Sequence, residues 1–276
     1  MIDIFALIAI ITGAILLIIA SIEDLKTREV PDYVSYTLIG SGIFIRVMWF
    51  LFEKNPAVLF WIPTSFLVLG GFSYMLYKSG QWGGGDVKIM AGVGILLSSF
   101  PGEIIPFFFN FLINSLLVGA IYGAFGIAIM VIANRKKVKF RWFELVLLPI
   151  FLVMSILLVY YTPLFLSFFG IFILVSILSL IYFKKIEESA MQMDVPVEKL
   201  TEGDWLVDDI KIEDKVFLKR RNIGLTLDDL KKLKKNKDKI KKVKIKTGIP
   251  FVPVFFITLV VTVFFGNILF ALMPLI

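Results

Sequence analysis

Residues 4–22 read IFALIAIITGAILLIIASI, an unbroken run without a single charged side chain. A helix needs about 20 such residues to cross the hydrocarbon core of a bilayer. The run follows Met-Ile-Asp instead of a basic segment, and no small-residue cleavage site comes after it. These features predict a retained membrane span, because a removable signal peptide would have both.

The composition of the whole chain agrees with this interpretation. Of its 276 residues, 58% are hydrophobic and only 18% are charged, whereas soluble domains are typically about 45–50% apolar. The chain has no cysteine and no histidine, which excludes disulfides, thiolate nucleophiles, iron–sulfur clusters and histidine-ligated zinc. Acid–base chemistry near neutral pH must therefore use Asp, Glu, Lys, Tyr or a water that they hold.

Seven further apolar runs follow the first one. They lie near residues 34–52, 57–77, 87–100, 103–133, 143–161, 163–183 and 249–273. The run at 87–100 is short for a full crossing, since a helix rises only about 1.5 Å per residue. The expected fold class is an all-α polytopic membrane protein with six to eight transmembrane helices.

The segment between the last two runs, residues 184–248, differs from the rest of the chain. It holds 18 of the 29 Lys and Arg residues and 13 of the 22 Asp and Glu residues. Its pattern predicts short strands within 205–212, 215–221 and 243–246, and a helix near 226–236 with Thr226 as N-cap and Asp229 three residues later. We expect a small cytoplasmic α+β domain at 184–248, inserted between a catalytic helical bundle at 1–183 and a C-terminal transmembrane helix at 249–276.

Basic residues in the loops predict the orientation. They gather at 23–33, 78–88, 134–142 and in the 184–248 insert, whereas the alternate loops contain only Lys54. Lys and Arg accumulate on the cytoplasmic side of membrane proteins. We therefore expect a multi-pass protein of the cytoplasmic membrane, with its insert in the cytoplasm and both chain ends outside.

Two acidic residues lie at the edges of the apolar runs, where ionisable groups are costly and often functional. Asp24 lies two residues after the end of the first run, and Asp86 opens the fourth one after Gly83, Gly84 and Gly85. The predicted topology places both at the cytoplasmic ends of their helices. Two facing carboxylates share one proton, so that one can activate a water while the other polarises a peptide carbonyl. The glycines would let a substrate backbone approach closely.

Less specific interpretations exist for each residue. An Asp after an apolar run is usually an ordinary loop residue, and a Gly-Gly-Gly-Asp sequence is often only a capped turn into a helix. Paired membrane acids also serve as ion or proton sites in transporters. A membrane scaffold with a cytoplasmic adaptor is a further alternative, which would tolerate Asn at both positions.

Three stretches resemble one family. Gly83-Gly84-Gly85-Asp86 fits G-x-G-D, residues 24–32 (DLKTREVPD) are similar to D-x-K-x-R-x-[IV]-P-[ND], and the charged insert is followed by 246–253 (KTGIPFVP). Together they resemble the archaeal preflagellin peptidases, in the type IV prepilin peptidase-like group of membrane aspartyl proteases. The resemblance implies Asp24 and Asp86 as the catalytic pair of an aspartic endopeptidase that works without a metal or other cofactor.

The resemblance also implies a substrate class. Membrane-anchored preflagellins or prepilin-like precursors would lose a short basic leader at the cytoplasmic membrane face. Without cysteine, the zinc loop of many bacterial enzymes is absent, so we expect protease activity only. The resemblance implies a core of six spans, in which case the block at 143–183 is an extra hairpin that either spans the membrane or lies in its interface.

Other residues have expected roles outside catalysis. Glu23, Glu29 and Asp32 are placed to attract a basic leader. The lysine-rich run 231–246 is expected to face anionic lipid headgroups, with no nucleic-acid partner. Gly119, Gly123 and Gly126 are spaced for helix packing. Trp82 and Tyr33 either anchor at the membrane interface, which we favour, or flank the substrate cleft. The sequence gives no oligomeric state.

Overall fold

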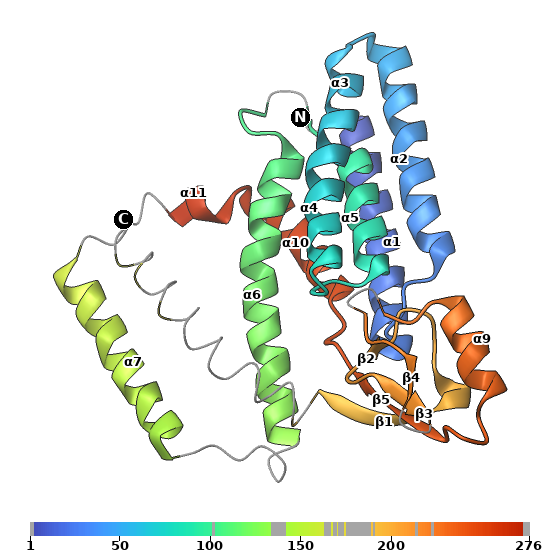
Figure 1. The fold of residues 1–276 in the computed structure, drawn as a ribbon. Helices are drawn as coiled ribbons and strands as arrows, with labels where there is room; N and C mark the ends of the chain where they lie inside the picture. The colour runs from blue at the N-terminus through green and yellow to red at the C-terminus, as the bar shows by residue number, and fades with distance from the viewer. Residues whose placement is uncertain are drawn as a thin grey trace.

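The computed structural model combines a helical bundle with small β-sheets at one end of it (Figure 1). The structure describes residues 3–100, 103–133, 142–162, 191–212, 215–221 and 224–272, together with the single residues 167, 170, 174 and 189.

The first two predicted spans are long helices. Helix α1 covers Ile4–Thr27, and α2 covers Asp32–Glu53. The carboxylate of Asp3 caps α1 by accepting the backbone N–H of Phe5 at 2.7 Å. Helix α1 ends where Arg28 adopts a left-handed conformation, which lets the chain turn back into α2.

The third predicted span is one continuous helical segment with an irregular middle. It consists of α3 (Ala57–Ser65), the π-helical turn η1 (Phe66–Gly70) and α4 (Gly71–Lys78). Proline inside a helix removes a backbone donor, and Pro63 precedes this widened turn. The hydroxyl of Ser65 donates to the carbonyl of Gly94 at 2.7 Å, and this contact ties the segment to the next helix.

Helix α5 (Gly84–Leu96) is the short, buried helix at the centre of the bundle. Its 13 residues rise about 20 Å, less than a bilayer core, which confirms the short run expected there. Residues 89–97 are all buried, as expected for a helix that is apolar on every side. The buried Arg46 donates to the carbonyl of Leu96 from Nε (3.2 Å) and Nη2 (3.0 Å), and from Nη1 to that of Ser99 (2.6 Å). These bonds satisfy carbonyls at the helix end.

The later helices are α6 (Phe107–Ala133), α7 (Trp142–Tyr161), α10 (Val252–Phe265) and α11 (Ile268–Leu272). Among the described residues, four helical segments are long and apolar enough to cross a membrane: Ile4–Thr27, Asp32–Glu53, Ala57–Lys78 and Phe107–Ala133. Shorter apolar helices cover Pro149–Tyr161 and Val252–Phe265. The expected count of six to eight spans is therefore not confirmed. The predicted run at 163–183 and the basic loop at 134–142 lie mostly outside the described residues.

The insert contains strands at the three predicted places and the predicted helix: β2 (Trp205–Leu206) and β3 (Ile210–Ile212) within 205–212, then β4 (Lys215–Leu218), α9 (Leu227–Lys235) and β5 (Lys242–Lys246). The sequence analysis predicted 205–212 as one strand and did not predict β1 (Gln192–Pro196) or the 3₁₀ turn η2 (Val197–Lys199). Strand β5 lies between β1 and β2 and pairs antiparallel with both, while β3 and β4 form a separate antiparallel pair. Their inward side chains form a hydrophobic cluster of their own, distinct from that of the bundle. The domain boundaries at 184 and 248 stay a prediction.

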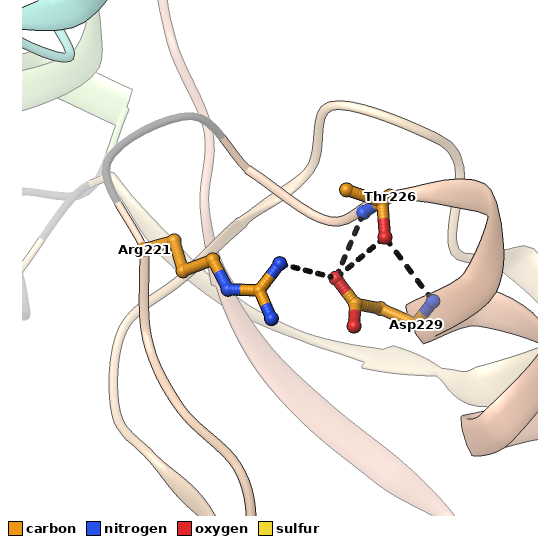
Figure 2. Close-up of polar contacts among 3 residues, drawn as sticks. All are labelled: Arg221, Thr226 and Asp229. Atoms are coloured by element: carbon orange, nitrogen blue, oxygen red, sulfur yellow. Dashed lines mark hydrogen bonds and ion pairs between the residues drawn. The ribbon is translucent and has the colours of Figure 1, made fainter.

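A reciprocal cap starts α9, as its sequence predicts (Figure 2). The N–H of Asp229 donates to Thr226 Oγ1 at 3.3 Å, and the N–H of Thr226 donates to Asp229 Oδ2 at 3.1 Å. Arg221 Nη1 lies 3.4 Å from the same carboxylate oxygen. Burial raises the pKa of Asp229, but the bonds from Thr226 and the charge of Arg221 outweigh it, so that the pKa lies below its usual value.

Candidate active site

Asp24 lies in the last turn of α1 and is only 6% exposed. Its Oδ2 accepts the backbone N–H of Val252 at 2.9 Å, across 228 positions of sequence. Val252 is the first residue of α10. Because a helix N-terminus carries partial positive charge, this contact favours a carboxylate at Asp24.

Asp86 lies in the first turn of α5. Its Oδ2 accepts the backbone N–H of Gly83 at 2.9 Å, so its side chain caps its own helix. The local interpretation of Gly-Gly-Gly-Asp as a capped turn is thus confirmed, and it does not exclude a catalytic role. The acceptor capacity of a carboxylate exceeds one hydrogen bond, so the same group can still bind a water.

The two acidic motifs pack against each other. A Cβ atom added to Gly85 would lie 3.0 Å from the Cβ of Val30, so this glycine lets the start of α5 approach the segment that follows α1. Lys88 Nζ forms an ion pair with Asp32 Oδ1 at 2.5 Å. These contacts bring the C-terminal end of α1 and the N-terminal end of α5 together, at the end of the bundle that faces the sheets (Figure 1). The carboxylates of Asp24 and Asp86 lie within electrostatic range of each other.

The start of α10 completes this region, and the sequence analysis did not predict its role. The ring of Trp82, just before the glycines, lies 5.3 Å from that of Phe251 and 5.5 Å from that of Phe255. Trp82 is 9% exposed within the protein core, so the expectation that it anchors at the membrane interface is wrong. The prolines at 250 and 253 were the available signal, because proline favours helix starts.

Two of the three small residues of α6 have the packing role expected of them. A Cβ atom on Gly119 would lie 2.8 Å from the ring of Phe251, and one on Gly126 would lie 2.8 Å from Ile249. Among the described residues, no atom outside the helix's own backbone lies within 4 Å of the corresponding position at Gly123. The segment before α10 therefore lies directly against α6.

The predicted leader-binding acids lie around this region. Glu23 is half-buried, Glu29 is exposed, and Asp32 is exposed but paired with Lys88. In the insert, burial raises the pKa of Asp204, and the nearby charge of Glu29 adds to this shift. The turn of the insert that carries Asp204 is thus close to the α1–α2 loop. Contact of these acids with a leader stays a prediction, as do the catalytic roles of the two aspartates and the substrate contacts of Gly83, Gly84 and Gly85.

Residues 11–124 match the Type IV leader peptidase family. This part of the chain contains both aspartates and all three glycines of the site. The recognised resemblance to this peptidase group is thereby confirmed.

Curated relatives agree with the family match. A preflagellin peptidase from Methanococcus maripaludis is 33% identical over 90 residues, which cover 33% of this chain and 39% of the relative. A preflagellin peptidase from Methanocaldococcus jannaschii is 32% identical over 33% of this chain and 38% of the relative. A prepilin peptidase from Methanothermobacter thermautotrophicus is 32% identical over 30% of this chain and 21% of the relative. The chain thus spans two fifths or less of the length of these relatives. The search of solved structures finds no match.

Proposed function

We propose that this chain is a membrane-embedded aspartic endopeptidase that removes short leaders from preflagellin-like or prepilin-like precursors. The observation that carries the proposal is the convergence of Asp24, buried at the end of α1, and Asp86, half-buried at the start of α5, within the segment that matches the leader peptidase family. The curated relatives are named as preflagellin and prepilin peptidases, which supports this class of substrate.

The proposed mechanism is general acid–base hydrolysis by a water between the two carboxylates. Two close carboxylates do not both ionise readily, so the pair holds one proton at working pH. The ionised group takes a proton from the water, and the protonated group polarises the scissile carbonyl and later protonates the departing amine. The proton belongs to the pair rather than to either residue.

The substrate is proposed to reach the pair from the cytoplasmic face. Loop charge supports this orientation, since basic residues accumulate on the side to which Asp24 and Asp86 point. A short basic leader would then meet Glu23, Glu29 and Asp32 before the scissile bond meets the aspartates. The ion pair with Lys88 already neutralises the charge of Asp32. Glu29 is therefore the better placed of these two acids to attract a basic leader.

The decisive experiment mixes the detergent-solubilised full chain with a preflagellin-like membrane substrate and measures product size. Asp24→Asn and Asp86→Asn are each expected to lower the cleavage rate by about 10²–10⁴-fold, the usual contribution of general acid–base catalysis. Asp228→Asn is the matched control, because this acid lies on α9 with its side chain 83% exposed. Normal cleavage by both amide variants would refute the proposal. Proton uptake into vesicles without peptide cleavage would favour a transporter.

A further inference from the structure

We propose that the backbone N–H of Val252 is a positioning group for Asp24, held in place by residues 247–253, which we call the strap. The inference rests on the proposed function for its activity assay, because it assigns a role within the same site. It adds to the two aspartates a third element, which comes from the far end of the chain.

The first observation is the hydrogen bond itself. The N–H of Val252 donates to Asp24 Oδ2 at 2.9 Å, and Val252 is fully buried while Asp24 is 6% exposed. A buried bond between an amide and a carboxylate is stronger than one exposed to water. It fixes one oxygen of Asp24 and thereby the orientation of the whole carboxyl group.

The second observation is the donor supply at the start of α10. Pro253 has no N–H, and the N–H of Val254 donates to the carbonyl of Phe251 at 2.9 Å. Of the first three residues of this helix, Val252 is therefore the one whose N–H is available to Asp24. Together with the backbone of Phe251, which also forms a hydrogen bond with Asp24, Val252 directs the positive end of the helix at this carboxylate.

The third observation is how firmly the strap is held. The ring of Phe251 lies against Trp82, and the room for it on α6 is left by Gly119. At the other end of the strap, the N–H and hydroxyl of Thr247 donate to the carbonyl of Met191 at 2.7 and 3.1 Å. The donor is thus anchored to the glycine motif, to α6 and to the insert at once.

The strap also connects the insert to the aspartate. Strand β5, the central strand of the three-stranded sheet, runs directly into the strap, and the strap runs into α10 (Figure 1). A displacement of the sheet relative to the bundle would therefore move the Val252 donor relative to Asp24. Movement of the insert could therefore change the position of the Asp24 carboxylate in the candidate catalytic pair.

The activity test compares Val252→Pro with Val252→Ala in the full chain. Proline removes the N–H and is tolerated at the first position of a helix, whereas alanine keeps the N–H and also shortens the side chain. We expect Val252→Pro to lower kcat by about tenfold or more relative to Val252→Ala, as for a lost hydrogen bond to a charged group, with KM unchanged. Equal kcat values, or a change in KM alone, would overturn the inference.

Proline also restricts the conformation of the residue before it, so Val252→Pro changes more than the hydrogen bond. A second measurement therefore uses neither a proline variant nor catalysis. Among residues 250–253, only Phe251 and Val252 have an amide hydrogen, so a peptide spanning them reports their exchange directly. Exchange at Val252 should accelerate in Asp24→Ala and stay at the wild-type rate in Asp86→Ala, whose partner is Gly83. Unchanged exchange in Asp24→Ala would overturn the inference, whether or not the chain cleaves precursors. Loss of the proposed function alone would leave the exchange result intact.

Discussion

Close backbone contact between α2 and α5 can be tested with two glycines of α2. A Cβ atom at Gly42 would lie 2.9 Å from the backbone nitrogen of Leu96 and 3.0 Å from its Cα. One at Gly40 would meet no atom of another described segment within 4 Å. Both changes to alanine improve helix propensity by about 0.5–1 kcal/mol. Only Gly42→Ala forces two helices apart, and overpacking typically costs about 1–3 kcal/mol.

At Gly42 the gain in helix propensity opposes the overpacking cost, whereas at Gly40 only the gain in propensity applies. We therefore expect Gly40→Ala to be neutral or stabilising and Gly42→Ala to be less stable than it by roughly 1–3 kcal/mol, the overpacking cost alone. Helix α5 carries Asp86, and small misplacements of catalytic groups are costly. Gly42→Ala should consequently also lose activity.

The assay is reversible unfolding of the purified protein in mixed detergent micelles, followed by circular dichroism, with precursor cleavage measured on the same samples. The comparison between the two variants removes the shared propensity effect. If Gly42→Ala unfolds at the same denaturant concentration as Gly40→Ala, the close approach of α2 to α5 is refuted. If Gly42→Ala lost activity without losing stability, the substitution would act on the candidate site and not on the packing of α2 against α5.

Two further predictions concern buried polar groups. Arg46→Met leaves carbonyls at the end of α5 without their donors and should destabilise the protein by about 2–5 kcal/mol, since each unsatisfied buried group costs roughly 1–3 kcal/mol; unfolding at the wild-type denaturant concentration would contradict this. The second uses the lowered pKa of Asp229. Its stabilising contribution is present above the unfolded-state pKa and is lost as the pH falls toward the lower folded-state value. Thermal unfolding at a series of pH values between about 6 and 3 should show a smaller decrease for Asp229→Asn than for wild type, and equal decreases would contradict the capping argument.

The role of Arg46 was not predicted from the sequence. The predicted functional charges were the acidic residues at the edges of the apolar runs, whereas this arginine lies within the second run. The structure buries its side chain completely, with its guanidinium carbon 5.1 Å from the ring of Trp49 and 5.3 Å from that of Phe100. The shortness of the run at 87–100 was the available signal, because a helix that ends inside a bundle leaves carbonyls that need donors.

Features that depend on near neighbours along the chain could be predicted without coordinates. Apolar run length gave the helices, and the cap of α9 could be read from Thr226 and Asp229, because three residues of spacing place both groups at one helix end. Loop charge and two short motifs selected Asp24 and Asp86 as the candidate pair.

The surroundings of that pair could not be predicted in this way. The partner of Asp24 is a backbone N–H 228 positions away. Every residue except proline has such a group, so the sequence does not indicate which one will bind Asp24. The burial of Trp82 against Phe251 likewise depends on how α10 enters the bundle. Hydrophobicity and spacing specify which segments are helical, but contacts between distant segments depend on side-chain volumes fitting together in three dimensions.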